Sequence, residues 1–389
     1  MLIGIIGAPN KGKSTLFSAL TLNEVHIANY PFTTINPNFG IAYITRECVE
    51  KELHIKCNAT EVCKDGKRLI PINIVDVAGL VKGAHEGKGM GNQFLNDLAT
   101  ASAYMLVVDA SGKTDPNGNP CENYDPLEDV KVVKDELVEW LAGIIKKHMK
   151  SIEKRADGIN ALYEILAGLN MPKAQIENAV NACRLTSSRI NWPDNEIKKF
   201  SGLLLDKAKP ILIVANKFDV HGAEKNYERF KAAFNGMTEW CTAEIELALR
   251  RAAKNGLIDY KPGAKSFTII KKELPQDQVS ALEYMQAFIA KKGTNVQNIL
   301  NRLVFDILNN IVVYPVEDEN KYTDHFGNVL PDAILIKKGS TAYDLAALIH
   351  TDIAKNMLYA IDAKSKLRLP KDYILKDGDV IKIVSAAKH

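Results

Sequence analysis

The sequence predicts an α/β fold interrupted by a helical insertion and followed by a small α+β domain. Three observations support this prediction. Short apolar, β-branched runs alternate with helical patterns, which is typical of parallel strands joined by crossover helices. A long helical stretch breaks this alternation, and after about residue 328 short strands surround one helix. The length of 389 residues suits two or three domains of ordinary size.

Four apolar runs are the predicted strands of the α/β part. The first run ends at Gly7, and the others are similarly short and rich in Ile and Val. Short, fully apolar runs of this kind indicate strands that are buried on both faces of a parallel sheet. The predicted strands are residues 2–6, 70–75, 104–108 and 210–215.

Residues 113–205 are predicted to form the insertion, which is helical and coiled-coil-like. Its first part, Gly112–Pro126, is rich in Asp, Asn, Gly and Pro and is expected to be a loop. From Val130 to Ile152 apolar residues recur at helical spacing, and Pro172 and Pro193 stand where new helices can begin. One connecting helix would not account for this length.

These patterns define three expected domains. Residues 1–112 and 206–315 form a discontinuous α/β domain whose last part is mostly helical, most clearly at 243–253 and 296–308. Residues 113–205 are the insertion. Residues 328–389 form the small C-terminal domain, with strands expected at 333–336, 373–375 and 380–384 and a helix at 342–349.

Composition excludes several classes of protein. Hydrophobic residues make up 46% and charged residues 25% of the chain, which excludes wholesale disorder, collagen-like repeats and a disulfide scaffold. The formal net charge of +3 is too small to identify a nucleic-acid binder. No apolar run reaches the roughly 18 residues that a membrane span needs, and the N-terminus does not look like a signal peptide. We therefore expect a cytoplasmic protein with reduced cysteines and no membrane partner.

Gly7–Ser14 matches the phosphate-loop pattern GxxxxGK[ST] in full and lies between a predicted strand and a predicted helix. The glycines allow backbone N–H groups to surround phosphate oxygens at the helix N-terminus. Lys13 is expected to reach the β- and γ-phosphates, and Ser14 is expected to bind Mg²⁺. The expected nucleotide contacts in this loop are Pro9, Asn10, Lys11, Gly12, Lys13, Ser14 and Thr15.

A second motif, Asp76-Val77-Ala78-Gly79, follows the strand at 70–75. A carboxylate at that position can hold Mg²⁺, usually through water, and the backbone N–H of Gly79 can approach the γ-phosphate. A DxxG motif is weak evidence alone, but its distance from the phosphate loop makes it strong here.

A third motif indicates guanine. Asn216-Lys217-Phe218-Asp219 follows the strand at 210–215 and matches NKxD. The Asp219 carboxylate can accept hydrogen bonds from guanine N1–H and its 2-amino group, a donor pair that adenine lacks. Asn216 and Lys217 would support the base and the phosphate loop. The segment Thr242-Ala243-Glu244 resembles a further base-contacting element, with Thr where Ser is usual.

Together these motifs resemble the YchF family, also called Obg-like ATPases, within the P-loop GTPases, and its archaeal-type members in particular. The motif FTTxxPN is present at 32–38, DVAGLVKGAHEGKGMGNQFL spans 76–95, and the C-terminus resembles a TGS domain. The resemblance implies that Thr34 closes on Mg²⁺ and the γ-phosphate as a switch. Many family members have lost NKxD and prefer ATP, whereas this sequence keeps the motif; we therefore expect GTP.

The water-positioning group is less clear. Leu80 stands directly after DxxG, where many GTPases have a Gln that orients the attacking water. We therefore expect slow hydrolysis of GTP to GDP and phosphate, with Lys13, Thr34, Gly79 and His85 as the candidate catalytic residues. Asn10 resembles the residue that helps to hold K⁺ in potassium-stimulated relatives. Two alternatives stay open: an ATP-preferring Obg-like ATPase, and a nucleotide-gated binding module in which hydrolysis is incidental.

Two further features bear on partners and metals. The C-terminal segment leans basic, with Lys364, Lys366, Arg368 and Lys371 close together, and in TGS-type domains such a surface suggests contact with the ribosome or RNA. His54, Cys57 and Cys63, with Cys48 upstream, match no recognised zinc pattern. We interpret these cysteines as free thiols on a hairpin, with redox sensitivity as the remaining hypothesis.

Overall fold

The structure is a computed structural model that describes residues 1–22, 39–77, 83, 99–188 and 190–386. Its described part divides into two compact units. Of the described residues, the first contains 1–22, 39–42 and those within 72–299, and the second contains 43–71 and those from Leu300 onward. Within the described part, no helix is both long enough and apolar enough to cross a membrane.

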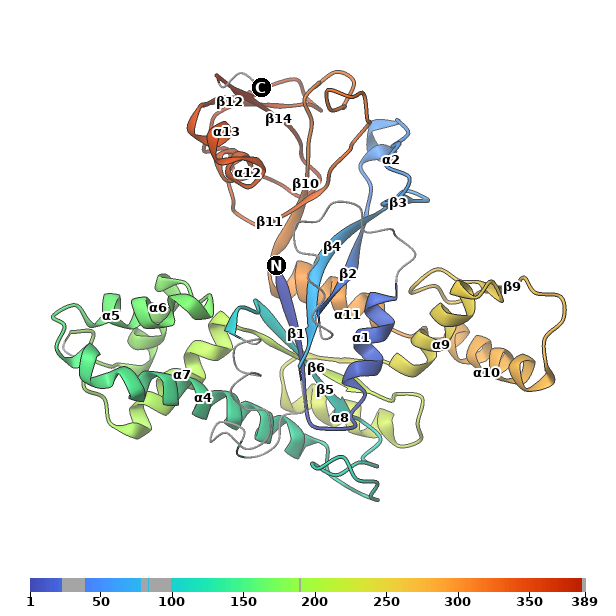
Figure 1. The fold of residues 1–389 in the computed structure, drawn as a ribbon, viewed down its shortest axis with the longest axis horizontal. Coiled ribbons are helices and arrows are strands. Elements are labelled where there is room, and N and C mark those ends of the chain that lie inside the picture. Colours follow the sequence, from blue (N-terminus) through green and yellow to red (C-terminus); the bar gives the residue numbers. More distant parts are fainter. Residues whose placement is uncertain (23–38, 78–82, 84–98, 189, 387–389) are drawn as a thin grey trace. The chain divides into compact units, whose positions relative to one another are not determined.

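A seven-stranded sheet contains all four predicted strands, which are confirmed (Figure 1). Most of it belongs to the first unit, whereas β3 and parts of β2 and β4 belong to the second. The strand order is β2-β4-β1-β5-β6-β7, with β3 paired to β4. The neighbours from β4 through β1, β5 and β6 to β7 are parallel. Every residue of β5 is buried, as the continuous apolar run predicts. The strands are β1 (Leu2–Ile6), β2 (Phe39–Glu47), β3 (Cys63–Lys64), β4 (Lys67–Asp76), β5 (Ala103–Asp109), β6 (Ile211–Asn216) and β7 (Thr238–Trp240).

The predicted insertion is helical. Its helices, green in Figure 1, pack on one another as α4 on α5 and α7, and α6 on α5 and α7. Their apolar faces share one core with the sheet, because Leu106 and Val108 of β5 belong to the same buried cluster as Val133 and Phe200. The expected boundaries at 113 and 205 therefore stay a prediction. The helices are α4 (Leu127–Glu153), α5 (Gly158–Leu166), η2 (Ala167–Leu169), α6 (Lys173–Cys183) and α7 (Asp194–Ala208).

Other helices complete the first unit. Helix α1 packs against α9, and α9, α10 and Ile258 of β8 contribute to a second small core. Strand β8 pairs with β9, whose residues are exposed. The elements are α1 (Lys13–Thr21), α8 (Ala223–Ala233), α9 (Ala243–Lys254), β8 (Ile258–Asp259), β9 (Thr268–Ile269), α10 (Gln276–Lys292) and α11 (Val296–Arg302), which continues past the unit boundary at Leu300 into η3 (Leu303–Ile307).

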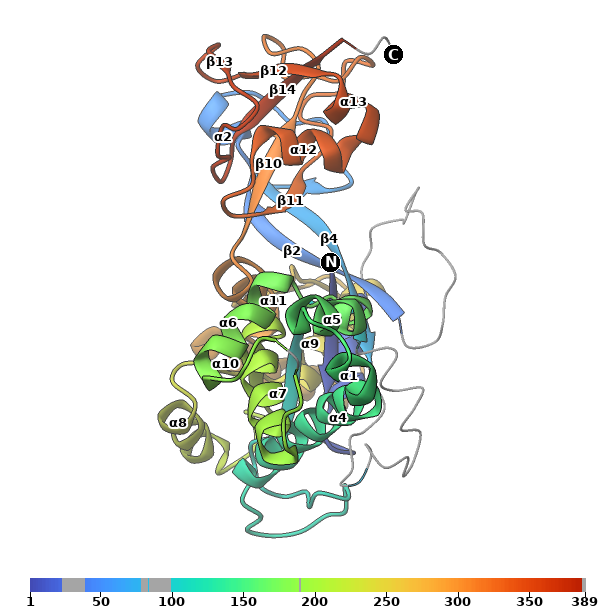
Figure 2. The same ribbon diagram turned by 90° about the vertical axis from the view of Figure 1, so that its left-hand side faces the viewer.

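The second unit is built on a five-stranded sheet in the order β11-β10-β14-β12-β13, and two helices contact it (Figure 2). Thr341 and Asp344 form a reciprocal capping box at the start of the predicted helix 342–349. The elements are α2 (Glu50–Leu53), β10 (Asn310–Pro315), β11 (Ile334–Lys337), α12 (Ala342–Ile349), α13 (Thr351–Lys355), β12 (Met357–Asp362), β13 (Arg368–Leu369) and β14 (Val380–Ser385).

Two details differ from the sequence-based expectation. Residues 310–315, assigned to the helical end of the α/β domain, form β10, which pairs with β11 and β14. The apolar run fits a buried strand equally well, and pairing with distant strands decides the outcome. Residues 373–375 are not a strand, because only Ile374 makes an isolated bridge, to Thr341. The turn at Lys376–Asp379 ends the segment before a ladder can form.

Candidate functional site

The phosphate loop lies between β1 and α1, as the motif predicts. Two of its glycines have positive φ angles, 144° at Gly7 and 93° at Gly12. A Cβ atom on Gly7 would collide with the carbonyl of Val107, and one on Gly12 would collide with the side-chain amide of Asn216. Because neither position has room for a side chain, glycine allows the loop to lie against β5 and β6. The loop leads into the N-terminus of α1, where backbone N–H groups favour a bound anion.

Lys13 begins α1, and its side chain folds back over the loop. Its Nζ donates a hydrogen bond to the carbonyl of Ala8 at 2.8 Å, and the residue is only 7% exposed. Burial lowers the pKa of the Lys13 ammonium, while the charge of Asp76 acts in the opposite direction. The Ala8 carbonyl therefore holds the ammonium group beside the loop, where a phosphate oxygen can replace it as the partner.

Asp76 ends β4, and its carboxylate lies beside the start of α1. Ser14 Oγ donates to Asp76 Oδ2 at 2.6 Å. The other carboxylate oxygen, Oδ1, is buried and has no hydrogen-bond partner within the described residues. Burial raises the pKa of Asp76, although the Ser14 hydroxyl and the Lys13 charge oppose this. A buried carboxylate oxygen without a partner, next to a hydroxyl, is the kind of oxygen ligand set that Mg²⁺ prefers, so these residues fit the ion.

Asn216 joins the phosphate loop to the predicted base-binding segment. It ends β6, and its Nδ2 donates to the carbonyl of Lys11 at 3.0 Å. Its Oδ1 accepts a hydrogen bond from the backbone N–H of Ala243 at 3.1 Å and one from the Cys241 thiol at 3.3 Å. One buried amide thus connects three segments that are far apart in the sequence.

Asp219 and Thr242 also meet. The Thr242 hydroxyl donates to Asp219 Oδ1 at 2.7 Å, and Thr242 lies directly before α9. Asp219 is partly exposed, Thr242 is buried, and Glu244 in the first turn of α9 is exposed. The structure thus places the NKxD carboxylate and the Thr242-Ala243-Glu244 segment side by side, as their order in the sequence suggested.

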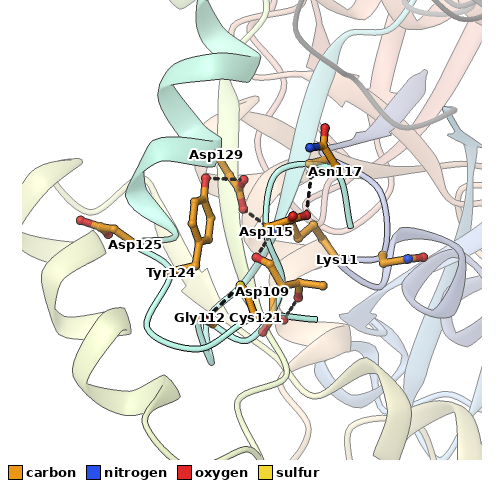
Figure 3. A network of polar contacts seen from close by, with 12 residues as sticks. Lys11, Asp109, Gly112, Asp115, Asn117, Cys121, Tyr124, Asp125 and Asp129 are labelled. Carbon is orange, nitrogen blue, oxygen red and sulfur yellow. Dashed lines mark hydrogen bonds and ion pairs between the residues drawn. The ribbon is translucent and has the colours of Figure 1, made fainter. Parts of the chain in front are cut away.

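The side chain of Lys11 points into a buried polar network, shown in Figure 3. Its Nζ donates to the carbonyl of Thr114 at 2.8 Å and forms an ion pair with Asp129 Oδ2 at 2.8 Å. Tyr124 donates to Asp129 Oδ1 at 3.0 Å, and its ring centroid lies 5.0 Å from the Lys11 Nζ. Since the Lys11 side chain is engaged here, the residue offers only its main chain to a nucleotide.

Asp109 is a residue of this site that the sequence analysis missed. It ends β5 next to Asn216 in register, and Lys217 Nζ forms an ion pair with it at 2.9 Å. Burial acts to raise the pKa of Asp109, but hydrogen bonds from two hydroxyls and from Lys217 hold it below the usual range. The carboxylate therefore stays charged and anchors Lys217, whose Nζ also reaches the Asn10 carbonyl at 3.2 Å. The position at a strand end is the sequence signal that could have revealed it.

The loop between β5 and α4 contacts the phosphate loop directly. Asn10 has a positive φ of 59°, and its Nδ2 donates to the Gly118 carbonyl at 2.9 Å. A Cβ atom on Gly118 would lie 3.0 Å from both the Asn10 side chain and Pro9, so the close approach requires glycine. The sequence predicted a loop here, but no motif indicated its role.

Several candidates lie outside the described residues. They are Thr34 in the predicted switch, Gly79 and Leu80 at the end of the DxxG motif, and His85.

Models of three protein families match this chain. The family described as "50S ribosome-binding GTPase" matches residues 2–147. The family "Obg-like GTPase YGR210-like, G4 motif-containing domain" matches residues 214–318. The TGS domain matches residues 326–385. The matches thus cover the phosphate loop, the NKxD segment and the C-terminal sheet respectively.

Curated relatives match over almost the whole chain. A protein of Methanocaldococcus jannaschii named as an uncharacterized GTP-binding protein is 51% identical and is covered over 100% of both chains. The ribosome-binding ATPase YchF of Mycoplasma genitalium is 30% identical, with 97% of each chain covered. The first relative is named for binding GTP, whereas the second is named as an ATPase.

Solved structures share the fold. The crystal structure of a GTP-binding protein from Pyrococcus horikoshii OT3 is 35% identical, with a TM-score of 0.80, and the match covers 99% of this chain and 100% of that one. The YchF GTPase of Schizosaccharomyces pombe has a TM-score of 0.58 at 21% identity, covering 99% of this chain and 97% of that one, which supports the fold alone.

Proposed function

Because the chain belongs to the YchF/Obg-like family of P-loop GTPases, we propose that it binds GTP with Mg²⁺, hydrolyses it slowly to GDP and phosphate, and acts as a nucleotide-gated regulator at the ribosome or on RNA. The observation that supports GTP most directly is the contact of Asp219 with Thr242, beside a phosphate loop to which Asn216 ties the same segment.

The base selectivity follows from the donors and acceptors that are present. Guanine offers N1–H and a 2-amino group on one edge, and a carboxylate can accept from both. The Thr242 hydroxyl occupies one lone pair of Asp219 Oδ1 and orients the carboxylate, so acceptor positions remain on both oxygens. Adenine has no donor pair on that edge, so the Asp219 carboxylate would lose its contacts with water without gaining hydrogen bonds to the base. This loss lowers the affinity for adenine.

The phosphate chemistry rests on three described residues. Lys13 would exchange its bond to the Ala8 carbonyl for the β- and γ-phosphate oxygens. Ser14 and Asp76 would hold Mg²⁺, with Thr34 as a further ligand implied by the family resemblance. When bound, this ion neutralises charge on the phosphate oxygens during transfer.

Slow hydrolysis is proposed because Leu80 follows the DxxG motif and cannot orient water. The Gly79 amide and His85 are the remaining candidates for this step, and both are assigned from the sequence alone. Asn10 is kept as a K⁺ ligand on the same basis; its amide nitrogen is bonded to the Gly118 carbonyl, which leaves the amide oxygen as the atom that could bind the ion.

Two alternatives have specific support. ATP preference is favoured by the names of relatives, since the Mycoplasma genitalium protein and human Obg-like ATPase 1 are both named as ATPases. A nucleotide-gated binding module with incidental hydrolysis is favoured by Leu80. Both alternatives use the same phosphate loop, so base selectivity and turnover are the measurements that separate them.

Calorimetric titration of GTP and ATP tests the base assignment. We expect the unchanged chain to prefer GTP and Asp219→Asn to lose about 10–150-fold in GTP affinity, because a charged hydrogen bond contributes about 1.5–3 kcal/mol. Asp372→Asn makes the same chemical change at an exposed site in the second unit and should bind as the unchanged chain does. Equal affinities for GTP and ATP, or an ATP preference, would contradict the GTP proposal.

The ribosome or RNA proposal rests on the C-terminal domain and on relatives named as ribosome-binding. Two of the four clustered cations are already engaged, because Lys364 pairs with Glu52 at 2.7 Å and Lys366 donates to the Glu319 carbonyl. Arg368 is exposed and lies over the Tyr359 ring at 3.5 Å, an arrangement on which a base can stack.

Co-sedimentation with ribosomes tests this surface. We expect Arg368→Glu in the full chain to reduce the bound fraction and to weaken its dependence on salt, because one cationic contact is reversed. Lys147→Glu, which reverses an exposed cation of α4, is the matched control. Unchanged binding of Arg368→Glu would remove this surface from the proposal.

A further inference from the structure

Three cysteines and a glutamate meet in the second unit. Cys48 follows β2, Glu50 begins α2, Cys57 lies in the following loop, and Cys63 begins β3. One ligand atom from each, a sulfur or a carboxylate oxygen, lies within 4.8 Å of the other three. Cys48 and Cys57 are buried, and all of these cysteines are free. The spacing considered in the sequence analysis included His54, which is not part of this cluster.

The backbone around the cluster brings these side chains together. Asp65 and Gly66 both have positive φ angles, 52° and 72°, and form the tight turn between β3 and β4. The Cys48 N–H donates to the Gly66 carbonyl at 2.8 Å, which places the end of β2 against this turn. The Cys57 N–H donates to Glu50 Oε2 at 2.8 Å, which fixes the glutamate beside the sulfurs.

A buried arginine faces the cluster and would stabilise negative charge there. Arg68 lies opposite Cys63 in the β3–β4 register and is 1% exposed. Its Nη1 donates to Cys57 Sγ at 3.2 Å and its Nη2 to the Pro331 carbonyl at 2.6 Å. No carboxylate of the described chain forms an ion pair with it. The Tyr314 ring lies 6.0 Å from the guanidinium carbon, and because burying a cation is costly, negative charge on the sulfur cluster that Arg68 faces would stabilise it.

We propose that Cys48, Glu50, Cys57 and Cys63 bind one zinc ion. Three sulfurs and one oxygen form the closed, four-ligand set typical of structural zinc, and thiolates favour zinc over magnesium or calcium. Zn–S bonds of about 2.3 Å and Zn–O bonds of about 2.1 Å place tetrahedral ligands about 3.6–3.8 Å apart. Small side-chain rotations bring atoms that already lie within 4.8 Å to that separation.

The charges balance with Arg68. Binding Zn²⁺ releases the three thiol protons to solvent, and the centre of three thiolates, one carboxylate and Zn²⁺ carries a net charge of −2. Arg68 offsets half of this charge and donates to the Cys57 sulfur, as outer-shell groups commonly do at metal centres.

The ion would stabilise the contact between segment 48–68 and residues 329–331 of the same unit. Beside Cys57, the Val329 N–H donates to Asn58 Oδ1 at 2.7 Å. Arg68 donates to the Pro331 carbonyl, so the zinc ligands and Arg68 together link segment 48–68 to residues 329–331. The zinc is therefore structural and independent of the nucleotide proposal.

Metal content of the full chain is the direct test. The protein is purified without a histidine tag or chelator and analysed by mass spectrometry of its metals, and we expect about one zinc per chain. Titration of the zinc-stripped chain with Co²⁺ should give the absorption of tetrahedral thiolate ligation. This measurement on the unchanged chain needs no variant, so a folding defect cannot obscure it.

Variants then assign the ligands. Cys57→Ser and Cys63→Ser should lose stoichiometric zinc while GTP binding in the first unit is retained. Glu50→Gln should lower zinc affinity by more than the 10–100-fold typical for loss of an outer-shell partner. Cys183→Ser removes a buried cysteine of α6 in the first unit and should keep the metal.

Three results would overturn the proposal. The first is a folded, unchanged chain that binds neither zinc nor Co²⁺. The second is unchanged zinc affinity in Cys57→Ser and Cys63→Ser. The third is a disulfide between two of these cysteines in the purified protein, found by thiol counting under denaturing conditions, since a disulfide removes two of the ligands.

Discussion

Replacing Lys11 by Met tests whether the buried network beside the phosphate loop holds the first unit together. Lys11 and Asp129 are 0% and 1% exposed, and their charged atoms lie 2.8 Å apart. The Met side chain fills a similar volume but leaves the Asp129 carboxylate buried without its cation. The substitution also removes the hydrogen bond to the Thr114 carbonyl.

The expected loss of stability follows from the burial of this pair. Removing one partner of a buried ion pair costs about 3–5 kcal/mol, against a total stability of about 5–15 kcal/mol for a typical domain. The Tyr124 hydroxyl still donates to Asp129, so we expect a value near the lower end, about 3 kcal/mol. Adding Asp129→Asn should recover most of this loss, because no buried charge then remains.

Urea unfolding followed by tryptophan fluorescence is a suitable assay. The three tryptophans, Trp140, Trp192 and Trp240, all belong to the first unit, so their signal reports its unfolding. Lys146→Met is the matched control, since Lys146 pairs with Asp194 at the surface and should cost about 0–1 kcal/mol.

The pH dependence has a definite sign. Burial raises the pKa of Asp129, and the charge of Lys11 opposes this shift. Without Lys11 the pKa rises further, so a falling pH protonates Asp129 and the penalty of Lys11→Met should shrink. A penalty below about 1 kcal/mol at neutral pH, or one that grows on acidification, would refute the assignment of a charged, buried pair.

Three further predictions concern the sites described above. Thr242→Val should weaken GTP about 2–10-fold in calorimetry, because a hydrogen bond to Asp219 contributes about 0.5–1.5 kcal/mol, and should leave any ATP binding unchanged. Asp76→Asn should raise the Mg²⁺ concentration needed for GTP binding about 10–100-fold. In the unchanged chain acidification should raise that concentration too, beginning at a pH above the range of an ordinary aspartate, because burial raises the pKa of Asp76 and its protonated form is a poorer ligand. Thr341→Ala should lower the stability of the second unit by about 1 kcal/mol in thermal unfolding through loss of the α12 cap, without affecting GTP affinity.

The sequence predicted those parts of the fold and site that local patterns specify. The strands before Gly7, Asp76 and Asn216 are short apolar runs, and each is followed by a motif whose residues fix the chemistry. Glycine positions in the phosphate loop follow from backbone conformations that other residues adopt poorly. For these features, a few neighbouring residues contain the whole reason for the structure.

The missing parts depend on contacts between distant residues. The strand at 310–315 could be recognised only through its pairing with β11 and with β14, the latter about 65 residues away. Asp109 and Lys11 acquire their roles from partners more than 100 residues away in the chain. Cys48, Cys57 and Cys63 were interpreted as free thiols because they follow no zinc spacing, and Glu50 was not considered with them; only the folded β3–β4 turn brings the four side chains together.

The hydrogen bond from Asn216 to the Lys11 carbonyl also affects when the site can form during synthesis. The two residues are 205 positions apart, so the phosphate loop leaves the ribosome long before the strand that completes it. At about 5–20 residues per second, the interval is roughly 10–40 s. Throughout that time the loop has its glycines but lacks the amide that Gly12 packs against. Nucleotide binding is therefore a late event in the life of a nascent chain, and a truncated product that ends before Asn216 lacks the complete site.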